Sequence, residues 1–169
     1  MPKPDLTRVP SFYHNYIAQV EQENLMDAFN SHQKEFVQLL ETLPANKWNN
    51  KYAEDKWTIK ELVQHVIDAE RIFCYRALCF ARNESVSLPG FDENNYAAAS
   101  KAAQRNPEEL IAELKIIQQS SALLFSSFDE EQLNATGIAN NFSIYVSAIG
   151  FIIVGHALHH VKILKERYL

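Results

Sequence analysis

The stretch from Asn140 to Val161 contains no Asp, Glu, Lys or Arg. It is long enough to cross a bilayer, but polar residues interrupt it: Asn140, Asn141, Ser143, Ser147 and three histidines. Such groups are costly in the hydrocarbon core of a membrane. The stretch therefore predicts a helix that is buried on most sides within a helical protein, and it argues against a membrane span.

Two stretches of the chain carry histidine on a core-facing stripe. In each stretch the stripe residues recur at alternating spacings of four and three, the period of one buried helix face. The downstream stripe consists of Ile149, Ile153, His156, His160, Ile163 and Arg167. The upstream stripe consists of Leu62, His65, Ala69, Ile72, Arg76 and Cys79. Three histidines thus take the places of apolar residues on buried faces.

These three histidines form a candidate metal site. His156 and His160 lie one helical turn apart, so their imidazoles can bind one cation, with His65 as the third ligand. A single histidine on an apolar face is more often a core residue hydrogen-bonded to a backbone carbonyl. Three buried imidazoles, however, would each need a partner and would repel one another when protonated, whereas one divalent ion satisfies all three.

Four long amphipathic segments predict a four-helix bundle. Their expected ranges are 24–43, 58–82, 107–127 and 143–168. A capping box from Thr58 to Glu61 begins the second helix, Pro107 is the first residue of the third, and Ser143 is the expected cap of the fourth. No stretch shows the alternation and turn signals of a β-hairpin. The prediction is a single all-α domain over residues 1–169.

Charge, cysteine content and the N-terminus limit the partners and the location. The net charge is −5 and no run of consecutive Lys or Arg occurs, which argues against a nucleic-acid partner. Cys74 and Cys79 are five residues apart on one predicted helix, so they point apart and cannot pair, as suits a reducing compartment. Residues 1–10 hold three of the six prolines and lack the apolar core of a secretory signal. We expect a cytoplasmic protein.

Other polar residues have weaker interpretations. His32 lies among polar neighbours, so we expect it to face solvent. Arg76, on the upstream stripe, is either a paired or snorkelling arginine or an anion-binding group below the histidines. Residues 83–99 are expected to form a loop, in which Asp92 and Glu93 could act as ligands or acid–base groups, although acidic loops are usually only solvated.

The motifs together resemble the DinB-like superfamily of four-helix bundles, which includes the YfiT-type metal hydrolases. The resemblance covers nearly the whole chain. The residues that carry it are Trp57 to Glu61, His65 with Glu70 and Arg71, Pro89 to Asp92, Gly155 to His160, and Glu166 to Tyr168.

The resemblance implies a divalent metal, commonly zinc or nickel, held by His65, His156 and His160 with one or more positions left to water. It also implies frequent homodimers and a small-molecule substrate. His159 would not be a ligand, and its position off the helical stripe agrees with that assignment.

The sequence leaves the chemistry open between three classes. An ion held by three neutral imidazoles lowers the pKa of a bound water, which favours a hydrolase. The same position could bind a low-molecular-weight thiol as its thiolate, and the superfamily includes thiol-dependent S-transferases. No carboxylate stands out as a general base; Asp68 is a weaker candidate for orienting an imidazole. The third class is a metal-stabilised binding module without activity.

Overall fold

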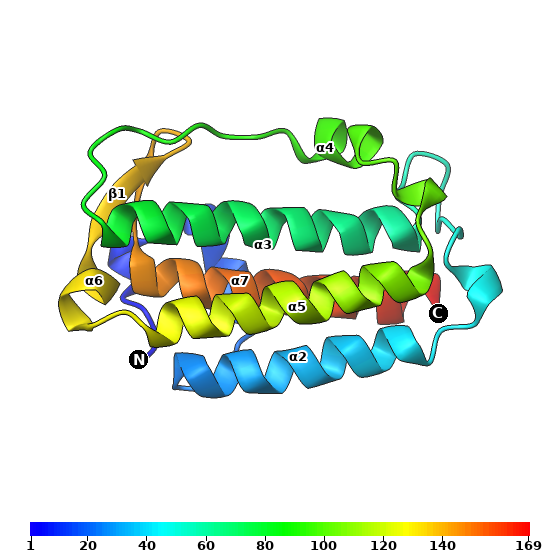
Figure 1. Cartoon of the computed structure of the whole chain (residues 1–169), viewed down its shortest axis with the longest axis horizontal. Coiled ribbons are helices and arrows are strands. Elements are labelled where there is room, and N and C mark those ends of the chain that lie inside the picture. The colour runs from blue at the N-terminus through cyan, green and yellow to red at the C-terminus, as the bar shows by residue number, and fades with distance from the viewer.

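A computed structural model describes residues 1–169, and four long helices pack side by side in it (Figure 1). These helices are α2 (Leu25–Glu41), α3 (Ile59–Ala81), α5 (Pro107–Ser126) and α7 (Val146–Ile163), the last extended by a π-helical turn (Leu164–Tyr168). The predicted fold class, a four-helix bundle, is confirmed.

The bundle has parallel as well as antiparallel neighbours. α3 packs against both α5 and α7, and α2 packs against the same two helices. In Figure 1, α3 and α5 run in one direction while α2 and α7 run in the other. Because α3 and α5 are parallel, the chain must return along the length of the bundle between them, and a long connection is the usual solution. That connection holds α4 (Glu93–Ala99) and a 3₁₀ turn (Ala102–Gln104).

Several short elements correct the sequence interpretation. The expected loop 83–99 contains α4, capped by the Asp92 side chain. The expected absence of a hairpin is wrong: β1 (Thr136–Ala139) pairs antiparallel with β2 (Phe142–Tyr145). Asn140 and Asn141 form its turn with φ of 50° and 64°, a conformation that asparagine tolerates better than most residues. Ser143 therefore lies within β2, and α7 begins three residues later than its predicted cap.

The remaining short elements flank the long helices. They are 3₁₀ turns at Leu6–Arg8, Ser11–Tyr13 and Ala45–Lys47, α1 (His14–Ile17) and α6 (Glu130–Asn134). The capping box predicted at Thr58 forms, and Pro107 is at the first position of α5, as expected, after a second box at Asn106. Helix caps can be recognised in the sequence because a cap satisfies backbone N–H groups of the first helical turn, which lies next to it in the chain.

α7 is the central helix, as its uncharged sequence predicted. The helix with its π-helical turn is long and apolar enough to span a membrane, but 72% of its apolar window is buried inside the bundle. Residues of α7 and its π-helical turn belong to two hydrophobic clusters. The hairpin-side core has 24 buried residues and includes the apolar residues from Val146 to Val154. The far-side core has 14 buried residues and includes Ala157, Val161, Leu164 and Tyr168. The candidate metal ligands lie where these two cores meet.

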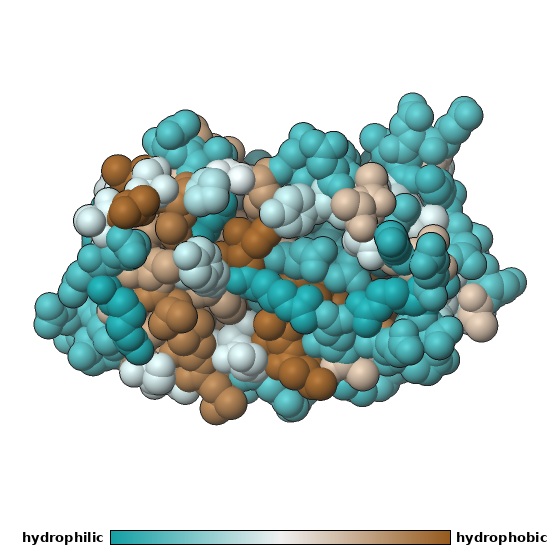
Figure 2. All heavy atoms as spheres, turned by 45° about the horizontal axis from the view of Figure 1, so that its top comes forward, coloured by the Kyte–Doolittle hydropathy of each residue, from teal (hydrophilic) through white to brown (hydrophobic).

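Exposed apolar side chains are concentrated on part of the surface. Figure 2 shows hydrophobic atoms mainly over the half of the molecule that carries the hairpin, whereas the other half is largely hydrophilic. On α5, Ile116 and Leu123 are 67% and 71% exposed. An apolar surface of this kind is compatible with the expected homodimer, which stays a prediction.

Two titratable groups are buried in the bundle away from the candidate metal ligands. His32, expected at the surface, is 2% exposed: its Nδ1 donates to the Ala28 carbonyl, and burial lowers its pKa to about 4. Polar neighbours in sequence were misleading because His32 turns inward beside Gln118 of α5. Glu70 is also 2% exposed; its Oε1 lies 2.6 Å from the Ser121 hydroxyl, and its Oε2 has no partner.

Glu70 predicts a specific pH dependence of stability. Burial raises its pKa from 4.5 to about 7, so between those values the folded protein holds a proton that the unfolded chain has lost. The stability contributed by the neutral carboxyl is full below about pH 4.5 and is lost as the pH rises through about 7, by about 3 kcal/mol in total. Urea unfolding between pH 4.5 and 8 should show this decline in the wild type and a smaller one in Glu70→Gln. Glu21→Gln, at an exposed position, should behave as the wild type; equal slopes in all three proteins would contradict the prediction.

Candidate metal centre

His65, His156 and His160 come from two antiparallel helices that pack against each other. The Thr58 to Glu61 capping box fixes the start of α3, with the Glu61 amide 3.1 Å from Thr58 Oγ1, and His65 follows on the second turn. His156 and His160 lie one turn apart on the buried face of α7. Close packing of α3 and α7 brings the three side chains to one point, as the two stripes predicted.

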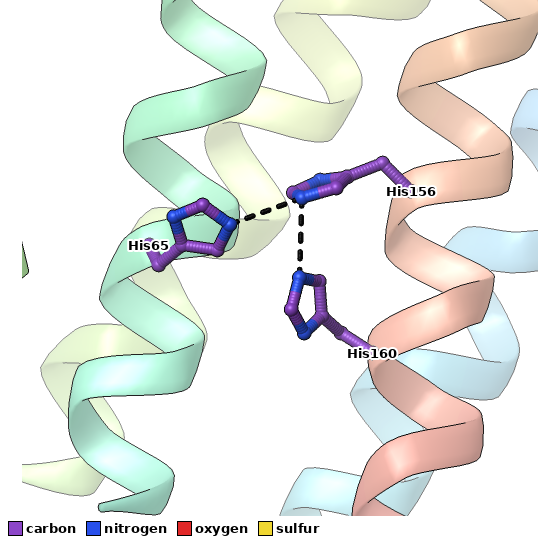
Figure 3. Close-up of side chains that lie close together, drawn as sticks. All are labelled: His65, His156 and His160. Atoms are coloured by element: carbon purple, nitrogen blue, oxygen red, sulfur yellow. Dashed lines mark hydrogen bonds between the residues drawn. The ribbon is translucent and has the colours of Figure 1, made fainter. Parts of the chain in front are cut away.

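The three imidazoles converge through their Nε2 atoms (Figure 3). His156 Nε2 is 3.0 Å from His65 Nε2 and 3.1 Å from His160 Nε2, and all three possible ligand atoms lie within 4.8 Å of one another. Zinc bound tetrahedrally by imidazole places its nitrogens roughly 3.3 Å apart. The spacing therefore suits one small divalent ion with little movement of the rings.

Burial keeps these imidazoles neutral. The rings are 7–9% exposed, and desolvation lowers the pKa of His65 to about 4. The pKa values of His156 and His160 fall further below the usual value, first through desolvation and then through the neighbouring histidines. Neutral imidazole is the form that binds a metal.

Hydrogen bonds within the protein do not satisfy all the ring nitrogens of this cluster. His156 Nε2 contacts two other imidazole nitrogens, yet a ring nitrogen has only one N–H or one lone pair to offer. His160 Nδ1 is also buried without a partner, which an ion bound at Nε2 would leave unchanged. A divalent cation at the point of convergence would accept all three Nε2 lone pairs, so the donor set fits a metal better than it fits a hydrogen-bonded core.

The rings around the cluster are aromatic, and no carboxylate contacts it. Trp57 stacks near His65 with ring centroids 4.7 Å apart, and Tyr16 meets His156 edge-on at 5.4 Å. The candidate orienting residue, Asp68, accepts a hydrogen bond from Gln64 at 2.9 Å and lies 3.7 Å from Arg71. Three residues after His65, Asp68 is turned about 60° around the helix, toward the α5 side. The structure thus gives Asp68 partners other than the histidines.

A cavity of about 310 Å³ opens onto the three histidines. α3, α7, the N-terminal segment, the connection after α3 and the hairpin turn all contribute to its walls. Besides the candidate ligands, its lining comprises Tyr13, Tyr16, Trp57, Ala69, Phe73, Arg76, Gly90, Phe91, Glu93, Asn140 and His159. A second cavity, of about 240 Å³, reaches His160 from the side of Tyr52 and Tyr168 and shares Trp57 and His159 with the first.

Sequence reasoning found the three histidines but missed most of the cavity. Tyr13 and Tyr16 lie at helical spacing, and nothing in the sequence distinguishes a cavity wall from ordinary packing at these positions. Glu93 lies on the cavity wall, whereas Asp92 caps α4 and does not line it. His159 lies outside the convergent group, as expected, with its ring 5.2 Å from that of His160. The lining comes from segments far apart in sequence, so no local pattern could identify it.

The bundle carries two histidines one turn apart on one helix and a third on the antiparallel neighbour. This arrangement defines a class of helical proteins able to hold a metal at the centre of the fold. Comparison with known proteins gives the family: the sequence profile of the DinB superfamily matches residues 28–164. The chain belongs to the DinB superfamily, as its motifs suggested.

A solved structure supports the same assignment of fold. YfiT from Bacillus subtilis, described as a probable metal-dependent hydrolase with an unusual four-helix bundle topology, superimposes with a TM-score of 0.75. The match covers 84% of this chain and 82% of YfiT at 16% sequence identity, so the likeness concerns the fold. No curated protein matches the sequence significantly.

Gly155 allows the N-terminal segment to approach the histidines. A Cβ at this position would overlap the backbone carbonyl group of Tyr16, so the absence of a side chain is what lets Tyr16 lie against His156. We predict that Gly155→Ala destabilises the protein by about 1–3 kcal/mol despite alanine's better helix propensity, because backbone must move. Urea unfolding measures the change.

Gly150→Ala is the matched control on the same helix. Its Cβ would meet the ends of the Leu25 and Phe125 side chains, which can adjust more easily than backbone. A smaller loss is therefore expected for Gly150→Ala than for Gly155→Ala. The reverse order would show that the N-terminal segment is not held tightly against α7.

Proposed function

We propose that the protein is a metal-dependent hydrolase that acts on a small molecule, with His65, His156 and His160 as the ligands of a divalent ion. The observation that carries the proposal is the convergence of three neutral Nε2 atoms at the wall of a cavity. No fourth His, Cys, Asp or Glu joins the group. Catalytic sites of this kind typically have three protein ligands and an open position, whereas structural sites are closed by a fourth.

A divalent ion held by three neutral ligands supplies a Lewis acid that lowers the pKa of a coordinated water toward neutrality. The protein contributes the surroundings. Trp57, Tyr16 and Phe73 cover the imidazoles with aromatic surface, which limits access by bulk water and strengthens electrostatic interactions. The solved structure of YfiT, with its description as a probable metal-dependent hydrolase, supports the same assignment.

Glu93 is the best-placed proton acceptor. It is the only carboxylate in the cavity lining, at the first turn of α4. Its charge lies close enough to Tyr16 to raise the pKa of that phenol, although burial is the larger cause. Hydrolysis needs a base that takes a proton from the attacking water, and Glu93 can do this from the cavity rim.

Metal content is the first test of the proposal. Elemental analysis should find about one equivalent of zinc or nickel in the gently purified wild type and little in His65→Ala or His160→Ala, because two imidazoles hold such ions weakly. His159→Ala is the control, adjacent in sequence and outside the convergent group, and should retain the metal. A wild type that contains no metal and takes up neither ion on addition would refute the site.

The role of Glu93 gives a separate prediction. Once an ester or amide substrate has been found by screening the metal-loaded protein, Glu93→Gln should lower kcat by about 10²–10⁴-fold because the proton acceptor is lost. Metal content should stay at the wild-type level, since Glu93 is not among the convergent ligands. Unchanged kcat in Glu93→Gln would assign the residue to the cavity wall alone.

Thiol transfer is the second candidate function. Two cavities meet at Trp57, His159 and His160, which would let a thiol and an electrophile enter from different sides. Zinc stabilises thiolate well, so the same ligands would serve. A reaction that requires an added low-molecular-weight thiol, and shows no ester or amide hydrolysis without it, would favour the transferase over the hydrolase.

A further inference from the structure

Arg76 is a buried cation without an acidic partner. The residue is 5% exposed, and every ion pair in the protein involves other residues. Its Nη2 donates to the Pro89 carbonyl at 2.9 Å, and the guanidinium carbon lies 5.7 Å from the Phe73 ring centre. The Tyr13 phenol also lies within hydrogen-bonding reach of the guanidinium. A carbonyl, a phenol and a ring, all neutral, compensate poorly for a desolvated full charge, which costs several kcal/mol when unpaired.

Arg76 lines the cavity and has N–H groups that no protein acceptor takes. Guanidinium has five N–H donors; the Pro89 carbonyl takes one of them, and the Tyr13 phenol lies within reach of another. The buried side-chain atoms that lack a partner belong to Glu70, Gln118 and His160, and none belongs to Arg76. The free donors of Arg76 are therefore not sealed within the core. They open onto the cavity that Arg76 lines.

The position of Arg76 relates it to the histidines. It follows His65 by eleven residues on the same stripe of α3, about 16 Å along the helix axis, and helical side chains lean back toward the N-terminus. Phe73 lies between the two groups: its ring is 5.7 Å from the guanidinium carbon and 6.3 Å from the His156 ring centre. Ala69, one turn before Phe73, lines the cavity between them with only a methyl group.

The cavity lining carries one positive and one negative side chain. Arg76 is its only Lys or Arg, and the exposed Glu93 is its only acid. Much of the remaining wall is aromatic and includes Tyr13, Tyr16, Trp57, Phe73 and Phe91. A planar guanidinium fork matches a carboxylate, and aromatic walls match an apolar or aromatic body.

We propose that Arg76 is the anion-binding group of this cavity, and that the substrate is a small organic carboxylate whose carboxylate lies at Arg76 while its reacting bond faces His65, His156 and His160. The first part is a statement about binding and stands without a metal. The second part rests on the proposed function. The proposal also gives a reason for a buried arginine on the same stripe of α3 as His65.

The test compares two probes of one shape on metal-free protein. 3-Phenylpropionate carries a carboxylate, and 3-phenylpropanamide replaces it with a neutral amide. Isothermal titration calorimetry at pH 7.5 should give a Kd at least tenfold lower for the carboxylate with wild type, as expected of a buried charge-assisted pair. Arg76→Gln should bind both probes equally. Arg71→Gln, which removes a charge from the same helix but pairs with Glu113 outside the cavity, should keep the preference.

Three results would overturn the proposal: equal Kd values for both probes in wild type, no saturable binding of the carboxylate, or a preference that survives in Arg76→Gln. Circular dichroism checks that the variants fold. If Arg76→Gln does not fold, the same two Kd values are measured for Arg76→Lys, which keeps the positive charge but lacks the planar guanidinium with its two parallel N–H donors. A several-fold smaller preference in Arg76→Lys supports the proposal, and a full one refutes it.

Metal content separates this proposal from the proposed function. Arg76→Gln should retain the wild-type metal content, because the three ligands are unchanged. If the protein prefers the carboxylate but never binds metal, the Arg76 proposal stands and the hydrolase proposal is refuted. If the protein binds metal but shows no preference for the carboxylate, the hydrolase proposal stands and the Arg76 proposal is refuted.

Discussion

The contact of three neutral imidazoles inside the bundle is the constraint on which the rest of the structure depends. His65, His156 and His160 can meet only if α3 and α7 pack closely, antiparallel and in one register. The cost of burying these polar rings is concentrated where the hairpin-side core and the far-side core meet. Two well-packed cores on either side provide the rigidity that a preorganised ligand set needs.

The long helices hold the ligands, while the peripheral segments shape the space above them. The N-terminal segment brings Tyr13 and Tyr16, the connection after α3 brings Phe91 and Glu93, and the hairpin turn brings Asn140. Backbone hydrogen bonds between Leu88 and the hairpin tie two of these segments together. The candidate ligands thus lie on the packed core, whereas most of the cavity wall lies on connections, which tolerate sequence change more easily than a packed core.

Several buried polar groups lack hydrogen-bond or charge partners. Some of them affect only stability, whereas others border a cavity where a ligand can bind. Glu70 and Gln118 each have a buried oxygen without a partner, and neither residue lines a cavity described above, so their effect is on stability. Arg76 and the three histidines border a cavity, so a ligand can supply what the protein lacks. Proteins tolerate such groups at functional sites because binding compensates there for what folding loses.

Sequence alone determined the four long helices, the capping box at Thr58, the burial of α7 and the three histidines on facing stripes, because each depends on spacing within one helix. It failed for the hairpin, whose strands are four residues long, and for His32, whose inward orientation depends on α5. The partners of Asp68, the cavity and the unpaired charge of Arg76 also emerged only in three dimensions. These features depend on contacts between segments up to 147 residues apart, as Tyr13 and His160 are, and helical periodicity carries no information about which side chains such contacts bring together.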